Sequence, residues 1–283
     1  MGDLLKIEKP LVSVNWLYQN KDAANLIVLD GTIPKVTSSK LNSGPETHQI
    51  IKTRFFDLKN IFSVQGATFP NTALISNEFE IEAKKIGINN DSCIVIYDTH
   101  GIYSSPRVWW LFKSMGFKNI AVLDGGFPAW RKAKYPTEKK QTHSFIFGNF
   151  KANYQPGKII NSDVVLESIS DSKKQIIDAR STGRFNATAL EPRKEIRNGR
   201  IPTSKNMPYT AVLDTNYLKN KEALKTIFQK MDSDKKSMYF SCGTGITACI
   251  LALAATVSGF SNIAVYDGSW TEWGSLTHLP IKK

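Results

Sequence analysis

A short glycine-rich segment near the C-terminal end contains the residue best suited to covalent chemistry, a cysteine. The segment reads Cys242-Gly243-Thr244-Gly245-Ile246-Thr247. It follows an apolar run, 238–241, that is typical of a buried strand, and it precedes 248–257, which is typical of an apolar helix. A cysteine between a strand and a helix faces the free N–H groups at the helix start, and these stabilise a thiolate. The glycines permit a tight turn that aims several N–H groups at one sulfur or oxyanion. We therefore predict that Cys242 is a nucleophile.

The other two cysteines do not share this setting. Cys93 lies in an apolar, strand-like run and Cys249 lies inside the predicted helix, so we expect both to be buried packing residues. Three cysteines without a Cys-x-x-Cys pair indicate neither a disulfide framework nor a zinc site. We expect no metal and no cofactor, and free thiols in a reducing compartment, the cytoplasm.

The charge of the chain limits the classes of partner. Its 283 residues are 41% hydrophobic and carry a formal net charge of +12, which suits an ordinary globular protein of two domains. The lysines are scattered singly and in pairs rather than gathered with aromatic residues, so we expect no nucleic-acid partner and a weak attraction for small anions. No stretch approaches the roughly 20 apolar residues that span a bilayer, so we expect no membrane partner and no signal peptide.

The chain repeats itself. Gly116 begins a run that ends in Asp124-Gly125, and Gly259 begins a similar run that ends in Asp267-Gly268, at an offset of 259 − 116 = 143 residues. Within each copy, short β-branched runs alternate with stretches of helical period, which indicates a parallel sheet covered by helices. The predicted fold class is α/β, with two tandem domains at 1–140 and 155–283 and a linker at 141–154.

The cysteine segment resembles the active-site loop of the rhodanese-like sulfurtransferases, in the form found in the 3-mercaptopyruvate branch. Further motifs that carry the resemblance are Tyr103-Ser104-Ser105-Pro106-Arg107, Leu123-Asp124-Gly125-Gly126 and Tyr266-Asp267-Gly268-Ser269-Trp270. The resemblance implies two tandem rhodanese-like domains, of which the first lacks the catalytic cysteine. The matching loop there reads Asp98-Thr99-His100-Gly101.

The same resemblance implies a reaction and its residues. Sulfur would move from 3-mercaptopyruvate, or thiosulfate, through a persulfide on Cys242 to a thiol, cyanide or a sulfur carrier such as thioredoxin, with release of pyruvate. Arg184 and Arg193 match the positions that hold the substrate carboxylate, and a guanidinium suits that task because it donates paired N–H bonds. Thiosulfate-preferring relatives carry basic residues after the cysteine, so Gly243 and Thr244 favour 3-mercaptopyruvate. Thr244 would donate its hydroxyl to the substrate carbonyl or the sulfur.

One departure from the family pattern concerns the first domain. Members often place an Asp and a His there, the His in a His-x-Leu-Pro context, to support the hydroxyl after the Cys-Gly pair. The comparable stretch here is Ala67-Thr68-Phe69-Pro70, and Asp57 lies near the Asp position. We therefore expect the loop amides and Thr244 to act without a histidine relay.

Three alternatives stay open at this point. Cysteine phosphatases and arsenate reductases use a related loop that ends in arginine, whereas Thr247 and Ala248 occupy that place here. A binding or regulatory module would keep the fold with an inert Cys242. Any single arginine could also be a surface or ion-paired residue, and the candidates are Arg180, Arg184, Arg193, Arg197 and Arg200.

Overall fold

The computed structural model describes residues 4–35, 46–231 and 237–283, and the chain divides into two compact units. The first unit comprises Met1–Gln65, Ala73–Gln155 and Thr215–Leu218. The second comprises Gly66–Thr72, Pro156–Asp214 and Lys219–Lys283. Each unit has its own parallel sheet flanked by helices, so the predicted α/β fold class is confirmed.

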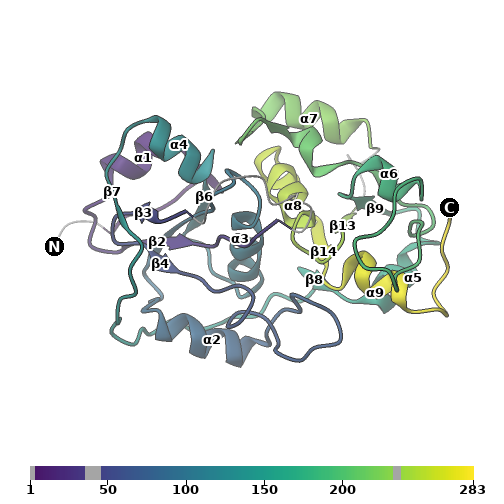
Figure 1. Ribbon diagram of the computed structural model, residues 1–283, viewed down its shortest axis with the longest axis horizontal. Helices are drawn as coiled ribbons and strands as arrows, with labels where there is room; N and C mark the ends of the chain where they lie inside the picture. Colours follow the sequence, from purple (N-terminus) through teal and green to yellow (C-terminus); the bar gives the residue numbers. More distant parts are fainter. Residues whose placement is uncertain (1–3, 36–45, 232–236) are drawn as a thin grey trace. The chain divides into compact units, whose positions relative to one another are not determined.

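The first unit is built on a five-stranded parallel sheet (Figure 1). In spatial order its strands are β1 (Leu11–Val12), β6 (Ile120–Leu123), β5 (Cys93–Tyr97), β2 (Leu26–Asp30) and β4 (Arg54–Phe55). The central strand β5 is buried at every residue, which explains its unbroken apolar sequence. The other elements are α1 (Val14–Gln19), α2 (Ser76–Lys85), α3 (Ser105–Ser114), α4 (Gly126–Lys132), β12 (Tyr217–Leu218) and the antiparallel pair β3 (His48–Ile50) and β7 (Thr137–Lys139).

The segment 141–154, predicted as a linker, lies in the first unit. The Gly148 N–H donates to the Lys84 carbonyl at 2.8 Å, and the Phe150 N–H donates to the Ile88 carbonyl at 3.0 Å. The ring of Phe150 is 1% exposed and contacts the rings of Phe79 and Phe112. Backbone bonds and aromatic packing therefore fix a stretch whose sequence shows no periodicity.

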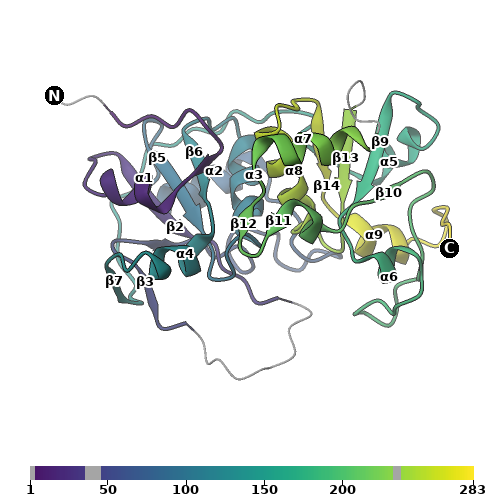
Figure 2. The ribbon, with the colours of Figure 1, turned by 90° about the horizontal axis from the view of Figure 1, so that it is seen from above.

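The second unit repeats the plan (Figure 2). Its parallel sheet has the spatial order β10 (Lys205–Asn206), β9 (Lys174–Asp178), β13 (Ser237–Ser241), β14 (Ile263–Tyr266) and β8 (Ile159–Ile160). The remaining elements are α5 (Ser162–Ser168), α6 (Thr182–Phe185), the 3₁₀ turn η1 (Tyr209–Val212), β11 (Leu213–Asp214), α7 (Lys221–Gln229), α8 (Ala248–Val257) and α9 (Ser269–Ser275). Helix α8 packs on β13 and β14, and its residues 248–255 are all buried, as an evenly apolar helix requires.

The strand registers align the two repeats residue by residue. Asp30 pairs with Tyr97 at the end of β2 and β5, and Asp178 pairs with Ser241 at the end of β9 and β13. The next residues along the chain, Asp98 and Cys242, therefore occupy equivalent places at the carboxyl edge of their sheets. In open α/β sheets this edge is where ligands bind. None of the described helices is long and apolar enough to cross a membrane.

Candidate active site

The cysteine loop joins the central strand of the second sheet to its most apolar helix. Cys242 comes directly after β13, and α8 begins at Ala248. The first residues of α9 form hydrogen bonds with the loop. The Trp270 N–H donates to the Cys242 carbonyl at 2.9 Å. The Gly243 carbonyl accepts from both the N–H and the hydroxyl of Thr271, at 2.9 and 2.6 Å. These bonds fix the carbonyls of the first two loop residues and leave the loop N–H groups available.

A row of N–H groups follows the cysteine. Within the part of the chain that the structure describes, no acceptor pairs with the N–H groups of residues 243–247. Gly245 has φ = +74°, a left-handed conformation that glycine adopts without strain and that lets the loop curl. Buried or half-buried N–H groups are normally paired, so an unpaired row beside a sulfur atom is suited to binding an anion.

The equivalent loop of the first unit holds such an anion from its own chain. One carboxylate oxygen of Asp98 accepts from the N–H groups of Tyr103, Ser104 and Ser105, at 2.8, 3.0 and 2.9 Å. It also accepts from the Ser105 hydroxyl at 2.6 Å, and the other oxygen accepts from the His100 N–H at 2.9 Å. The loop of this fold is therefore a cradle for negative charge. In the first unit a carboxylate fills it, and in the second unit the equivalent residue is Cys242.

The three cysteines differ in their surroundings. The Cys242 side chain is largely buried, and its sulfur lies 4.0 Å from the Ser269 hydroxyl oxygen, which also accepts from the Cys242 N–H at 3.1 Å. Cys249 is buried in α8 and donates to the Gly245 carbonyl. Cys93 is buried in β5, and desolvation raises the pKa of its thiol to about 12. Of the three, only Cys242 directly precedes the row of unpaired N–H groups, whereas the Cys249 thiol donates to a carbonyl of the same loop.

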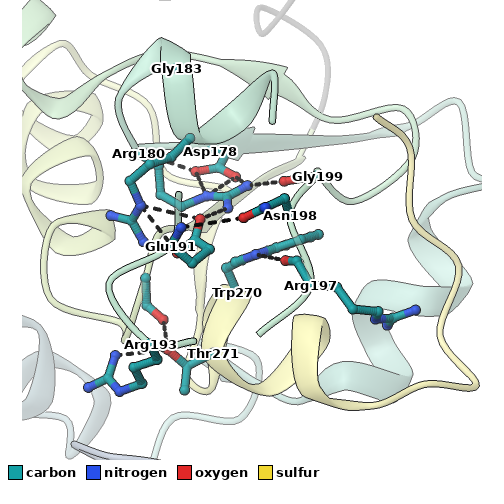
Figure 3. A network of polar contacts seen from close by, with 12 residues as sticks. Asp178, Arg180, Gly183, Glu191, Arg193, Arg197, Asn198, Gly199, Trp270 and Thr271 are labelled. Carbon is teal, nitrogen blue, oxygen red and sulfur yellow. Dashed lines mark hydrogen bonds and ion pairs between the residues drawn. The ribbon is translucent and has the colours of Figure 1, made fainter. Parts of the chain in front are cut away.

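The five candidate arginines separate into structural and loop-facing residues, and Figure 3 shows three of them, Arg180, Arg193 and Arg197. Arg180 is 2% exposed, binds Asp178 and the Gly199 carbonyl, and stacks on Trp270 at 4.3 Å. Arg197 donates to carbonyls at the end of α9, including that of Gly274. Arg200 lies over the Phe185 ring. These three arginines stabilise the fold, and apart from Asp178 their partners lie well away in the sequence.

Arg184 and Arg193, the two predicted carboxylate ligands, both lie at the loop. An added Cβ on Gly243 would be 3.2 Å from Nη2 and 3.8 Å from Nη1 of Arg184, so this guanidinium covers the residue after the cysteine. Arg193 donates through Nη1 to the Thr271 hydroxyl at 3.4 Å, and that hydroxyl donates in turn to the Gly243 carbonyl. The structure thus brings both arginines to Gly243 from different segments.

The other predicted loop residues occupy distinct positions. Thr244 and Thr247 are half-buried, and Gly245 and Ile246 are buried. The Thr244 carbonyl accepts from the Asn71 side chain at 3.4 Å, and Asn71 belongs to the segment Gly66–Thr72 of the second unit. That segment contains Ala67–Pro70, where the histidine of the family pattern is missing. An amide contact to the loop backbone is found there instead.

Sequence reasoning missed two residues of the site, Glu191 and Ser269. Glu191 is a buried carboxylate that binds both Arg180 and Arg184. The sequence feature that could have identified Glu191 is its place between Arg184 and Arg193, two residues before Arg193. Ser269 has φ = +51° at the position where the first repeat has Gly126 with φ = +53°, and comparing the two repeats position by position would have identified it. No group of three His, Cys, Asp or Glu side chains suited to a metal occurs among the residues described.

Comparison with known proteins gives consistent results over nearly the whole chain. The family model described as "Rhodanese-like domain" matches residues 13–133 and 162–276. "Thiosulfate/3-mercaptopyruvate sulfurtransferase 1, mitochondrial" of Arabidopsis thaliana is 36% identical over 97% of this chain and 78% of its own length. The "3-mercaptopyruvate sulfurtransferase" of Mus musculus is 35% identical over 94% of this chain and 92% of its own length. The crystal structure of SseA from Escherichia coli superposes with a TM-score of 0.81 at 26% identity, covering 93% of this chain and 99% of that one.

Proposed function

This chain belongs to the rhodanese family, and from that premise we propose that its second unit transfers sulfur from 3-mercaptopyruvate through a persulfide on Cys242. The chain is an enzyme of the sulfurtransferase class, with two rhodanese-like domains. The observation that carries the proposal for the site is the row of N–H groups at 243–247, which have no acceptor in the described part of the chain and directly follow Cys242.

The first step moves one sulfur atom onto the enzyme. The Cys242 thiolate attacks the sulfur of 3-mercaptopyruvate, the carbon–sulfur bond breaks, and its electron pair remains on the organic fragment as the enolate of pyruvate. The proton that the donor thiol gives up reaches the enolate carbon, directly or through solvent, and the fragment leaves as pyruvate. The persulfide anion that remains on Cys242 is stabilised by the N–H groups of 243–247, because those donors have no acceptor in the described part of the chain. The Asp98 carboxylate in the first repeat supports this use of the loop.

The second step returns the thiolate. An acceptor thiolate or cyanide attacks the outer sulfur, the sulfur–sulfur bond breaks, and its electron pair returns to Cys242. A sulfur-carrier protein such as thioredoxin belongs to the same class of acceptor. The cytoplasm remains the proposed location of the reaction, because three cysteines without a paired framework suit a reducing compartment.

The carboxylate of the donor is assigned to Arg184 and Arg193. Both guanidinium groups reach Gly243, one directly and one through Thr271. A carboxylate held there keeps the donor sulfur next to Cys242, and the Thr244 hydroxyl is then the proposed partner of the keto oxygen. Charge-assisted bonds of this kind contribute about 1.5–3 kcal/mol each.

Each of the two rival functions predicts a result that differs from the result expected of a sulfurtransferase. A cysteine phosphatase needs an arginine at the end of its loop, and this loop ends in Thr247 and Ala248, so we expect no hydrolysis of an aryl phosphate. A binding module with an inert cysteine would show the alkylation rate of an ordinary buried thiol at Cys242. We expect faster alkylation there than at Cys93, whose pKa is raised to about 12.

The experiment that tests the donor is a comparison of kcat/KM for 3-mercaptopyruvate and for thiosulfate, measured on one preparation with cyanide as acceptor. We expect a clear preference for 3-mercaptopyruvate, because neither Gly243 nor Thr244 offers a positive charge to a second anionic group. A clear preference for thiosulfate would overturn the donor assignment and leave the sulfurtransferase class unchanged.

A further inference from the structure

Glu191 is a buried carboxylate that forms ion pairs with two arginines, Arg180 and Arg184, and Figure 3 shows it beside Arg180. Its side chain is 3% exposed. One oxygen accepts from Nη1 of Arg180 at 2.7 Å, and the other accepts from Nη2 of Arg184 at 2.5 Å. The Arg184 Nε also lies 3.2 Å from both oxygens. Glu191 therefore fixes the orientation of the guanidinium that covers Gly243, with Nη1 of Arg184 left over for a ligand.

The charges of this network cancel. Asp178 and Glu191 supply two negative charges, and Arg180 and Arg184 supply two positive charges, all within one chain of ion pairs. Because the four groups are buried or nearly so, solvent screens their charges weakly. Arg184 can donate hydrogen bonds to a ligand, while Glu191 largely offsets its positive charge.

Arg193 has a different electrostatic environment. Its guanidinium donates to the neutral hydroxyl of Thr271 at 3.4 Å, and among the described residues no carboxylate pairs with it. The arginines and carboxylates that the second unit gathers at the loop therefore leave one uncompensated positive charge. The Cys242 thiolate is the same for either donor and is stabilised by the loop N–H groups. Apart from that thiolate, a donor with one negative charge balances Arg193, whereas a donor with two leaves an excess negative charge close to the Glu191 carboxylate.

The two donors of this reaction class differ in that respect. Near neutral pH 3-mercaptopyruvate carries one full negative charge, since its thiol titrates like other alkyl thiols, and thiosulfate carries two. We propose that Glu191 is a specificity-determining residue: its charge matches the site to a singly charged keto acid and disfavours doubly charged thiosulfate. This inference rests on the proposed function and adds the origin of the donor preference.

The test is Glu191→Gln in the full chain, because glutamine keeps the shape and removes the charge. The readout is the ratio of kcat/KM for thiosulfate to kcat/KM for 3-mercaptopyruvate, and we expect it to rise about tenfold or more, since one unit charge is removed from a poorly screened position. Glu195→Gln is the matched control, because Glu195 lies exposed in the same segment and its charge is screened. We expect the ratio of that variant to equal the wild-type ratio.

Further variants separate charge from folding. Glu191→Asp retains the charge, so its ratio should stay near the wild-type value even where both rates fall. Arg193→Gln removes the uncompensated positive charge from a half-buried side chain, so its ratio should fall below the wild-type value, and this variant tests the charge argument even where Glu191→Gln does not fold. An equal fall in kcat/KM for both donors in Glu191→Gln would overturn the inference. A change of the ratio in Glu195→Gln as large as that in Glu191→Gln would also overturn it. Failure of the wild-type enzyme to take sulfur from either donor would instead contradict the proposed function.

Discussion

The strained serine beside the cysteine provides a prediction in which stability and reactivity respond differently. Ser269 is fully buried with φ = +51°, a left-handed conformation that costs a residue with a Cβ about 1–2 kcal/mol. Its hydroxyl accepts from the Cys242 N–H at 3.1 Å and donates to the Tyr266 carbonyl at 2.8 Å. We compare Ser269→Gly with Ser269→Ala, because both remove the hydroxyl and only glycine removes the strain.

The expected changes in the free energy of unfolding follow from these two terms. Loss of the hydroxyl leaves the buried Cys242 N–H without its partner, which costs about 1–3 kcal/mol in both variants. Glycine recovers about 1 kcal/mol of the strain, and alanine recovers none. We therefore expect Ser269→Gly to be more stable than Ser269→Ala by about 1 kcal/mol, although alanine is the better residue in an unstrained helix.

The assay has two parts. Urea denaturation of the full chain gives the stability order, and alkylation by iodoacetamide, followed by mass analysis of the labelled peptide, gives the reactivity of Cys242. Both variants should alkylate Cys242 more slowly than wild type and at rates close to each other, because both lack the hydroxyl that fixes the cysteine. Cys93 is the internal control and should stay unlabelled. If alanine proves as stable as glycine, or if the two variants differ in reactivity as they do in stability, the reasoning about strain is refuted.

Three further substitutions test the parts of the site separately. Gly245→Ala places a Cβ at φ = +74° and should slow persulfide formation while costing about 1–2 kcal/mol, and normal persulfide formation in a stopped-flow measurement would contradict the role of the loop turn. Asp98→Asn cannot accept from all the N–H groups that the carboxylate binds, so urea denaturation should show a loss of about 2–3 kcal/mol, and an unchanged midpoint would contradict the cradle in the first repeat. Arg184→Lys keeps the charge and loses the fork, so KM for 3-mercaptopyruvate should rise about tenfold in steady-state kinetics, and an unchanged KM would remove Arg184 from the donor site.

The sequence was sufficient to predict the fold class and the loop because both depend on local patterns. Alternating apolar runs indicate parallel sheets, and a cysteine followed by glycines between a strand and a helix indicates a cradle of N–H groups. The comparison of the two loops required coordinates, because the equivalence of Asp98 and Cys242 follows from strand register. The 143-residue offset found in the sequence at Gly116 and Gly259 does not reproduce that pairing, since it aligns Cys242 with Thr99.

The roles of the arginines could not be predicted from local sequence patterns. Arg180, Arg184 and Arg197 look alike in the sequence, and their roles depend on distant partners, such as Trp270 for Arg180 and Gly274 for Arg197. Burial also sets the role of Glu191, because the charge of a carboxylate excluded from solvent acts on the two guanidinium groups with little screening. These relations are set by the packing of segments far apart in the chain, so no residue spacing predicts them.

The central claim is that Cys242 carries sulfur during the reaction, and intact-mass analysis tests it most directly. The enzyme is treated with 3-mercaptopyruvate without an acceptor, next to Cys242→Ser and Cys249→Ser. The account predicts one added sulfur atom on the wild-type chain and on Cys249→Ser, and none on Cys242→Ser. An equal gain of sulfur on Cys242→Ser would contradict it.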